Sequence, residues 1–134
     1  FLKKFNYSNL ISMNLYEFEQ KLNCNCDNYK KIFSAYKKNK LNVPCAVTLG
    51  KKGSVFCEKN NFYYCPSFFN SPNDTVGCGD AFFTIASMLK EIKVDPELIL
   101  FISNCYAGLH SNYLGNKTII KKKELLQTML TLLS

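Results

Sequence analysis

The sequence contains no arginine and no tryptophan, and its only histidine is His110. All 17 basic residues are lysines, which outnumber the 10 acidic residues and give a net charge of +7. Nucleic-acid-binding proteins usually include arginine, because its planar side chain makes paired hydrogen bonds to phosphate and guanine. The lysines are scattered in small groups, which is typical of a solvated surface. We therefore expect no nucleic-acid partner.

Long hydrophobic runs are also absent. The longest apolar stretches, such as Leu98–Ile102, are far shorter than the roughly 20 residues needed to cross a bilayer. The composition, with 47% hydrophobic and 14% aromatic residues, is sufficient for a packed core. We expect residues 1–134 to form one compact domain in the cytoplasm, without a membrane partner. Because the chain begins with Phe1 rather than methionine, we expect it to be part of a longer polypeptide.

The seven cysteines do not form a recognisable disulfide or zinc pattern. Their number is odd and no Cys-x-x-Cys pair is present. Cys24 and Cys26 are too close together and too isolated to form a zinc site. Most of the others lie in apolar runs, where a reduced cysteine packs as a small hydrophobic residue. We expect free thiols, as in a reducing compartment.

Hydrophobic periodicity predicts alternating strands and helices. The apolar run Cys45–Leu49 shows no alternation, which is typical of a central strand in a parallel sheet. Alternating elements with an inserted hairpin indicate a layered α/β fold. The expected elements are a strand over 9–13, helices over 16–22 and 29–39, a strand over 45–49, a hairpin of 54–58 and 62–65, helices from 79 or 80 to about 91, from 96 to about 113 and over 123–133, and an extended piece over 118–120.

The segment from Gly77 to Asp80 is the most informative part of the chain. Two glycines flank one small residue at the start of an amphipathic helix, so the backbone can approach a ligand closely. The unpaired N–H groups and the dipole of such a helix favour an anion such as phosphate. The carboxylate of Asp80 could accept a proton from an attacking hydroxyl there. From these residues alone, a turn with Asp80 as a simple helix cap is an equally good interpretation.

The wider pattern resembles the ribokinase-like, or PfkB-type, carbohydrate kinases. The segment DTVGCGD (residues 74–80) is similar to the family signature Asp-Thr-x-Gly-Ala-Gly-Asp. Three further segments follow the family's order: NLYE (14–17), VTLGKKG (47–53) and NCYAG (104–108). The resemblance covers nearly the whole chain. Residues 107–118 are similar to the end of the heptose-phosphate kinase branch, whose members are often fused to a nucleotidyltransferase domain.

The resemblance implies a three-layer α/β/α fold of which only the C-terminal half is present, without the sugar-binding half and lid. It implies phosphoryl transfer from ATP to a hydroxyl of a sugar or sugar phosphate. By motif position, Asp80 would be the general base and the backbone of Gly77, Cys78 and Gly79 would form the anion hole. Cys78 replaces the family's usual alanine. The resemblance assigns six residues to the nucleotide, Thr48, Gly50, Gly53, Thr75, Asn104 and Gly108, and two to Mg²⁺, Asn14 and Glu17.

A second function remains open, namely a non-catalytic nucleotide-binding or interaction domain of a larger protein. We expect the isolated chain to be inactive, and to self-associate if a strand edge is exposed. The remaining polar and aromatic residues are interpreted structurally: His110 as a satisfied histidine on a helix face, Tyr63, Tyr64, Phe68 and Phe69 as packing residues, and Lys51 and Lys52 as a solvated turn.

Overall fold

The computed structural model describes residues 8–69, 77–112 and 119–134. Its centre is a four-stranded sheet in the order β1-β2-β3-β4. β1 pairs with β2 in parallel, whereas β2–β3 and β3–β4 are antiparallel. The strands are β1 (Ile11–Asn14), β2 (Cys45–Thr48), β3 (Ser54–Glu58) and β4 (Asn61–Cys65).

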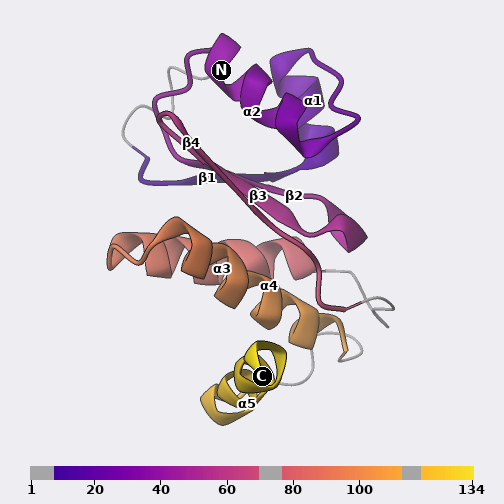
Figure 1. Ribbon diagram of the computed structural model, residues 1–134, viewed down its shortest axis with the longest axis vertical. Helices are drawn as coiled ribbons and strands as arrows, with labels where there is room; N and C mark the ends of the chain where they lie inside the picture. Colours follow the sequence, from indigo (N-terminus) through magenta and orange to yellow (C-terminus); the bar gives the residue numbers. More distant parts are fainter. Residues whose placement is uncertain (1–7, 70–76, 113–118) are drawn as a thin grey trace.

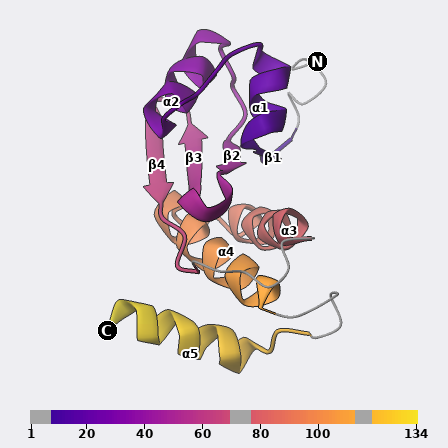
Figure 2. The same ribbon diagram turned by 90° about the vertical axis from the view of Figure 1, so that its right-hand side faces the viewer.

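Helices cover both faces of the sheet (Figure 1). α1 and α2 lie on one face, α3 and α4 lie on the other, and α5 packs against α4 on its outer side (Figure 2). The helices are α1 (Leu15–Leu22), α2 (Tyr29–Lys38), α3 (Cys78–Glu91), α4 (Pro96–Ser111) and α5 (Lys122–Leu133), with a short 3₁₀ helix, η2 (Gly50–Lys52), between β2 and β3. None of the described helices has the length and hydropathy needed to span a membrane.

The core consists of two clusters, because alternate side chains of the central strands point to opposite faces. Val47 and Val55 pack against the α1–α2 layer, in a cluster with Phe18, Ile32 and Tyr36. Ala46 and Phe56 belong to the opposite cluster, whose main helical members are Phe82, Ala86, Ile99 and Leu100. Burial of both faces of β2 explains why its sequence shows no apolar alternation.

The layered α/β fold expected from the sequence is confirmed, with differences in detail. The sheet is mixed, because the strand after β2 returns through the tight turn Gly50–Gly53 and pairs antiparallel with it. α3 begins at Cys78, earlier than expected, and α4 ends at Ser111 rather than near residue 113. Ile119 and Ile120 form no strand, and residue 118 lies outside the described ranges. All seven cysteines are free thiols, as expected.

Candidate functional site

The carboxyl ends of the two parallel strands place Asn14 and Thr48 side by side. These residues are register partners at the last position of β1 and β2. Ligands of open α/β sheets characteristically bind beside the carboxyl ends of the parallel strands. η2 follows β2, and α1 follows β1 directly. Two of the four family-like segments therefore meet at one edge of the sheet.

A cleft of about 500 Å³ opens at this edge. Its wall contains residues from all four family-like segments, since the α3 and α4 segments also reach it. Eight residues predicted from the sequence line it: Asn14, Thr48, Gly50, Gly53, Cys78, Gly79, Asn104 and Gly108. Six others were not predicted as site residues: Lys51, Ser67, Phe69, Phe82, Ala107 and Ser111.

Four predicted residues are not part of this lining. Gly77 and Asp80 lie at the start of α3, and Asp80 is exposed. Glu17 lies in the first turn of α1. Thr75 lies outside the described residues. The carboxylate of Asp80 thus lies outside the cleft lining, although the preceding residue, Gly79, is part of it.

The N-terminus of α3 has the backbone geometry of an anion-binding turn. Gly77 precedes the helix with φ +80°, a left-handed conformation that glycine adopts without strain. Among the described residues, no side chain caps this helix. The first-turn N–H groups of any α-helix have no partner within the helix, and the helix dipole makes this end positive. Gly79 brings this end of α3 to the cleft wall.

Asn14 and Glu17 form a reciprocal capping box at the start of α1. Asn14 Oδ1 accepts a hydrogen bond from the Glu17 N–H at 2.8 Å, and Glu17 Oε2 accepts one from the Asn14 N–H at 3.0 Å. This arrangement satisfies two backbone donors that a helix start leaves unpaired. The pair therefore has a structural function in addition to the one that the resemblance implies.

Asn104 of α4 fixes the wall of the cleft through its own amide. Its Oδ1 accepts a hydrogen bond from Ser54 Oγ at 3.0 Å. Its Nδ2 donates to the carbonyls of Cys65 at 3.3 Å and Pro66 at 3.4 Å. Because both ends of the amide are bonded to the protein, Asn104 shapes the cleft rather than presenting an unpaired amide to it.

Two glycines allow the segment Cys65–Phe69 to pass closely between its neighbours. A Cβ on Gly53 would lie 2.7 Å from Pro66 Cα and would also collide with the Cys65 carbonyl oxygen. A Cβ on Gly108 would overlap the ring of Phe69. Gly53, with φ +99°, is also in a conformation that disfavours other residues. Both glycines therefore shape the cleft by allowing close approach, a function that the sequence could suggest only through the family resemblance.

The structure also tests the residues that were interpreted as structural. Tyr64 stacks on Tyr29 with ring centroids 4.6 Å apart, and Phe68 meets Phe101 edge-on at 5.4 Å, which confirms packing. The interpretation of His110 as satisfied was wrong, because its Nε2 is buried and has no hydrogen-bond partner in the described part of the chain. Lys51 is exposed, as expected, but it also lines the cleft, where its charge attracts anions.

Comparison with known proteins identifies the family of the chain. The model of the pfkB family carbohydrate kinases matches residues 2–90. No curated protein sequence matches the chain.

Several solved structures share the fold. The ribokinase of Arabidopsis thaliana, complexed with ribose and ATP, is 21% identical with a TM-score of 0.85, and the match covers 96% of this chain and 43% of that one. The Thermotoga maritima ribokinase is 22% identical with a TM-score of 0.80, covering 97% and 45%. The Vibrio cholerae fructokinase, bound to fructose, ADP and calcium, is 18% identical with a TM-score of 0.77, covering 96% and 43%.

The chain thus spans less than half the length of these kinases. At such low identity they establish the fold, which is ribokinase-like with a mixed sheet between helical layers. The family model covers well over half of the chain, including the β1, β2 and α3 segments that meet at the cleft. The chain belongs to the pfkB family of carbohydrate kinases.

Proposed function

We propose that this chain binds ATP in the cleft and, within a complete kinase, takes part in phosphoryl transfer to a hydroxyl of a sugar or sugar phosphate. The observation that carries the proposal is the convergence of eight predicted residues, from four separated segments, on one cleft of about 500 Å³. A pocket of this volume is large enough for a small-molecule cofactor. The A. thaliana ribokinase, whose fold the chain shares, was solved with ribose and ATP.

The proposed chemistry assigns a task to each part of the site. The turn Gly77–Gly79 and the N-terminus of α3 hold negative charge on the phosphates, through backbone N–H groups and the helix dipole. Asp80, in the first turn of the same helix, accepts the proton of the acceptor hydroxyl. Lys51, exposed at the cleft, adds positive charge. Thr48, Gly50, Gly53 and Gly108 lie along the nucleotide. Thr75, which is outside the described residues, is assigned to the phosphates by its motif position alone.

A magnesium ion fits this donor set only as a largely hydrated ion. The described residues contain no group of three or more His, Cys, Asp or Glu side chains suited to a metal. Mg²⁺ is typically bound through one or two oxygen ligands, several waters and the substrate phosphates. Asn14 and Glu17 would supply those oxygens, with the capping box holding both side chains in place. The ion would neutralise charge on the phosphates.

The finer substrate assignment is also part of the proposal. The similarity of residues 107–118 to the heptose-phosphate kinase branch favours a heptose phosphate and a fused nucleotidyltransferase domain. Only residues 107–112 of that segment are described, and they form the end of α4 and its C-cap, Asn112. β1 and β4 are the outer strands of the described sheet, so the rest of a kinase, or a second copy, would pair at one of these two strand edges.

A non-catalytic nucleotide-binding or interaction domain is the second candidate. It is favoured by the exposure of Asp80 outside the cleft lining. We expect the isolated chain to bind nucleotide weakly and to phosphorylate no sugar. A coupled assay of ADP formation with a panel of sugars and sugar phosphates tests this, since measurable turnover would contradict inactivity.

The nucleotide assignment itself is tested by calorimetric titration of the chain with ATP and MgCl₂. Lys51→Glu should weaken binding severalfold, because it reverses a charge at the cleft. Lys123→Glu, in α5 and outside the cleft lining, makes the same change in net charge and should have little effect. Equal weakening by both variants, or no binding of ATP by the unmodified chain, would overturn the proposed nucleotide site.

A further inference from the structure

Cys24 and Cys26 bring two thiols together in the loop between α1 and α2. Their Sγ atoms are 3.8 Å apart and share a hydrogen bond in which either can be the donor. Cys24 is half-buried, whereas Cys26 is only 5% exposed. The pair therefore has one accessible sulfur in direct contact with one protected sulfur. Neither residue has a place in the proposed kinase site.

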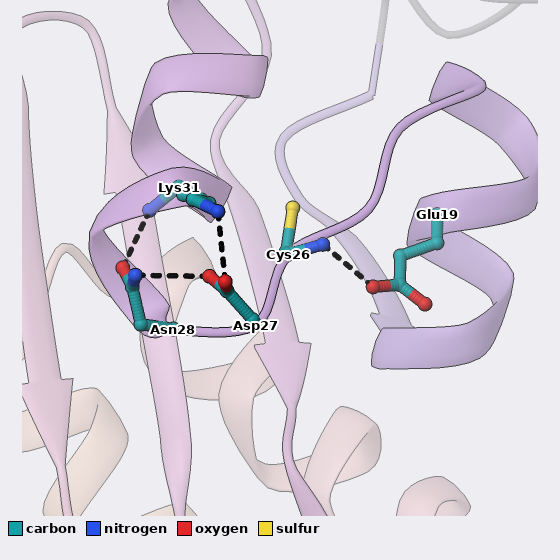
Figure 3. A network of polar contacts seen from close by, with 5 residues as sticks. All are labelled: Glu19, Cys26, Asp27, Asn28 and Lys31. Carbon is teal, nitrogen blue, oxygen red and sulfur yellow. Dashed lines mark hydrogen bonds and ion pairs between the residues drawn. The ribbon is translucent and has the colours of Figure 1, made fainter.

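The backbone on both sides of the pair is held in place, and Figure 3 shows the contacts of Cys26 with Glu19 and of Asn28 with Lys31. The Cys26 N–H donates to Glu19 Oε1 at 2.7 Å, and the Cys24 N–H donates to the Glu19 carbonyl at 3.1 Å. Beyond Cys26, Asn28 caps α2 by accepting from the Lys31 N–H at 3.2 Å. The folded loop thus keeps the two sulfurs in contact, which lowers the entropic cost of joining them.

The positions of Cys24 and Cys26 are close to those that a disulfide bond requires. A disulfide needs its sulfurs about 2.0 Å apart and its Cα atoms within about 7 Å. Residues two apart along a chain have Cα atoms at most about 7.2 Å apart when fully extended, so any bend of the backbone between them brings the pair within this limit. The sulfurs start 3.8 Å apart, so side-chain rotation with a small loop adjustment brings them to bonding distance.

The structure offers a contrasting pair in the core. Cys45 and Cys57 face one another across β2 and β3 as register partners, and both are 0% exposed. Burial raises the pKa of Cys45 to about 12, so its reactive thiolate form is scarce at neutral pH. Proximity alone therefore does not select a pair for oxidation, because access from solvent is needed as well.

We propose that Cys24 and Cys26 are an oxidative modification site, and that they form a disulfide within their loop when the protein meets a hydroperoxide. The thiolate of Cys24 attacks one peroxide oxygen, the O–O bond breaks and hydroxide leaves, which gives a sulfenic acid. The sulfur of Cys26 then attacks the Cys24 sulfur, the S–O bond breaks, and water leaves with the Cys26 proton. Two thiols are oxidised to one disulfide, and hydrogen peroxide is reduced to two waters.

The environments of the two thiols set the order of these events. Burial, with the Cys24 thiol as a hydrogen-bond and charge neighbour, raises the pKa of Cys26 to about 12. Cys26 therefore remains protonated and is poorly placed for the first attack, which falls to the more accessible Cys24. Cys26 acts second, from its position against the oxidised sulfur.

A disulfide between Cys24 and Cys26 would also alter the protein surface close to the cleft. Cys26, Asp27 and Asn28 line a second cavity of about 300 Å³. This cavity shares Lys51 and Ser67 with the larger cleft, so the two lie next to one another. A disulfide at Cys26 would therefore reshape a wall close to the proposed nucleotide site.

The sequence makes the test direct. Trypsin cleaves after Lys21 and Lys30, which releases the peptide Leu22–Lys30 with both cysteines and no other. The folded chain is treated with a dose of hydrogen peroxide that oxidises glutathione, blocked with N-ethylmaleimide and digested without reductant. The peptide should lack both maleimide adducts, be lighter by two hydrogen atoms, and regain two thiols with dithiothreitol.

Two controls accompany the test. In Cys26→Ser, Cys24 should stop at the sulfenic acid and be trapped by dimedone. The peptides carrying Cys45 and Cys57 should show no oxidation at the same dose. A peptide that stays fully alkylated, that carries Cys24 only as sulfinic acid, or that is cross-linked to a second chain would overturn the proposal. None of these readouts depends on nucleotide binding, so this proposal and the proposed function can fail separately.

Discussion

Ser54 and Asn104, which are 50 positions apart, are joined by a hydrogen bond of 3.0 Å from Ser54 Oγ to Asn104 Oδ1. The bond connects the first residue of β3 to α4, one of the two helices on the α3–α4 face of the sheet. Through Nδ2, the same Asn104 amide holds the carbonyls of Cys65 and Pro66. One side chain therefore links β3, α4 and the segment Cys65–Phe69 at the wall of the cleft.

Asn104→Ala should lower the free energy of unfolding by about 1–3 kcal/mol, the usual cost of leaving buried polar groups unpaired. The reason is that Ser54, at 0% exposure, loses its acceptor, while two carbonyls lose their donor. Urea denaturation measures the change. Asn104→Ala should also weaken ATP binding, because Ser67 and Phe69 of the held segment line the cleft.

A double-mutant cycle with Ser54→Ala separates this bond from a general loss of packing. Once Asn104 is absent, removal of the Ser54 hydroxyl should cost much less than it does in the unmodified chain. Asn112→Ala makes the same change at an exposed position just after α4 and should alter stability by no more than about 0.5 kcal/mol. Additive effects of the Ser54 and Asn104 changes would contradict the coupling.

Gly108→Ala should destabilise the chain, by an amount that depends on Phe69. In the unmodified protein the new methyl group overlaps the Phe69 ring, and overpacking typically costs about 1–3 kcal/mol. In a Phe69→Ala background that overlap is absent. The same substitution should then be neutral or stabilising, because alanine is favoured over glycine inside a helix by about 1 kcal/mol. Thermal unfolding of the four proteins gives the comparison.

Gly79→Ala is the matched control for that experiment. Gly79 lies in α3 with nothing within 4 Å of the position of a new Cβ. We expect stability to be unchanged or slightly raised. If Gly108→Ala destabilised the chain equally with and without the Phe69 ring, the close approach of ring and helix would not be the cause.

The sequence predicted the elements well because most of them carry a local signal. The apolar residues Ile32 and Tyr36 follow the helical period of α2. The helix expected over 16–22 is α1, which begins at Leu15 because Asn14 and Glu17 cap it, a signal that was not used in the prediction from the sequence. The mixed character of the sheet was not predicted, because an unbroken apolar run such as Cys45–Leu49 indicates burial on both faces but not strand direction.

The residues that line the cleft were predicted where a motif exists and missed where none does. Ser67 and Phe69 carry no local signal, since they reach the cleft only because Asn104 and the glycines Gly53 and Gly108 hold their segment there. The sequence also could not show that His110 Nε2 has no hydrogen-bond partner among the described residues, because such partners depend on packing between distant segments.

Alkaline pH should destabilise the fold through its buried thiols. Burial raises the pKa values of the Cys45 and Cys105 thiols from their ordinary value of 9.0 to about 12. The unfolded chain therefore releases these protons from about pH 9, while the folded chain keeps them. Stability that is complete below pH 9 is lost as the pH rises toward 12, with a slope of about 1.4 kcal/mol per pH unit for each fully buried thiol.

Urea denaturation between pH 7 and pH 11 measures this slope. Cys45→Ala removes one of the titrating groups, so the decline of stability with pH should be shallower in the variant, whatever its stability at pH 7. The lysines also titrate in this range, but they are the same in both proteins and cancel in the comparison. Parallel curves would show that Cys45 ionises alike in the folded and unfolded states.

Asp80→Asn tests the assignment of the proton acceptor in a polypeptide that contains this chain together with the rest of a kinase. The amide is nearly isosteric with the carboxylate but cannot take up the hydroxyl proton, so turnover should fall by about 10²-fold or more. ATP affinity should change little, because Asp80 is exposed and does not line the cleft. Glu97→Gln makes the same chemical change in the first turn of α4 and should leave turnover intact. Unchanged turnover in Asp80→Asn would remove the base assignment, whereas an equal loss of ATP affinity would mean that the carboxylate contributes to nucleotide binding rather than to proton transfer.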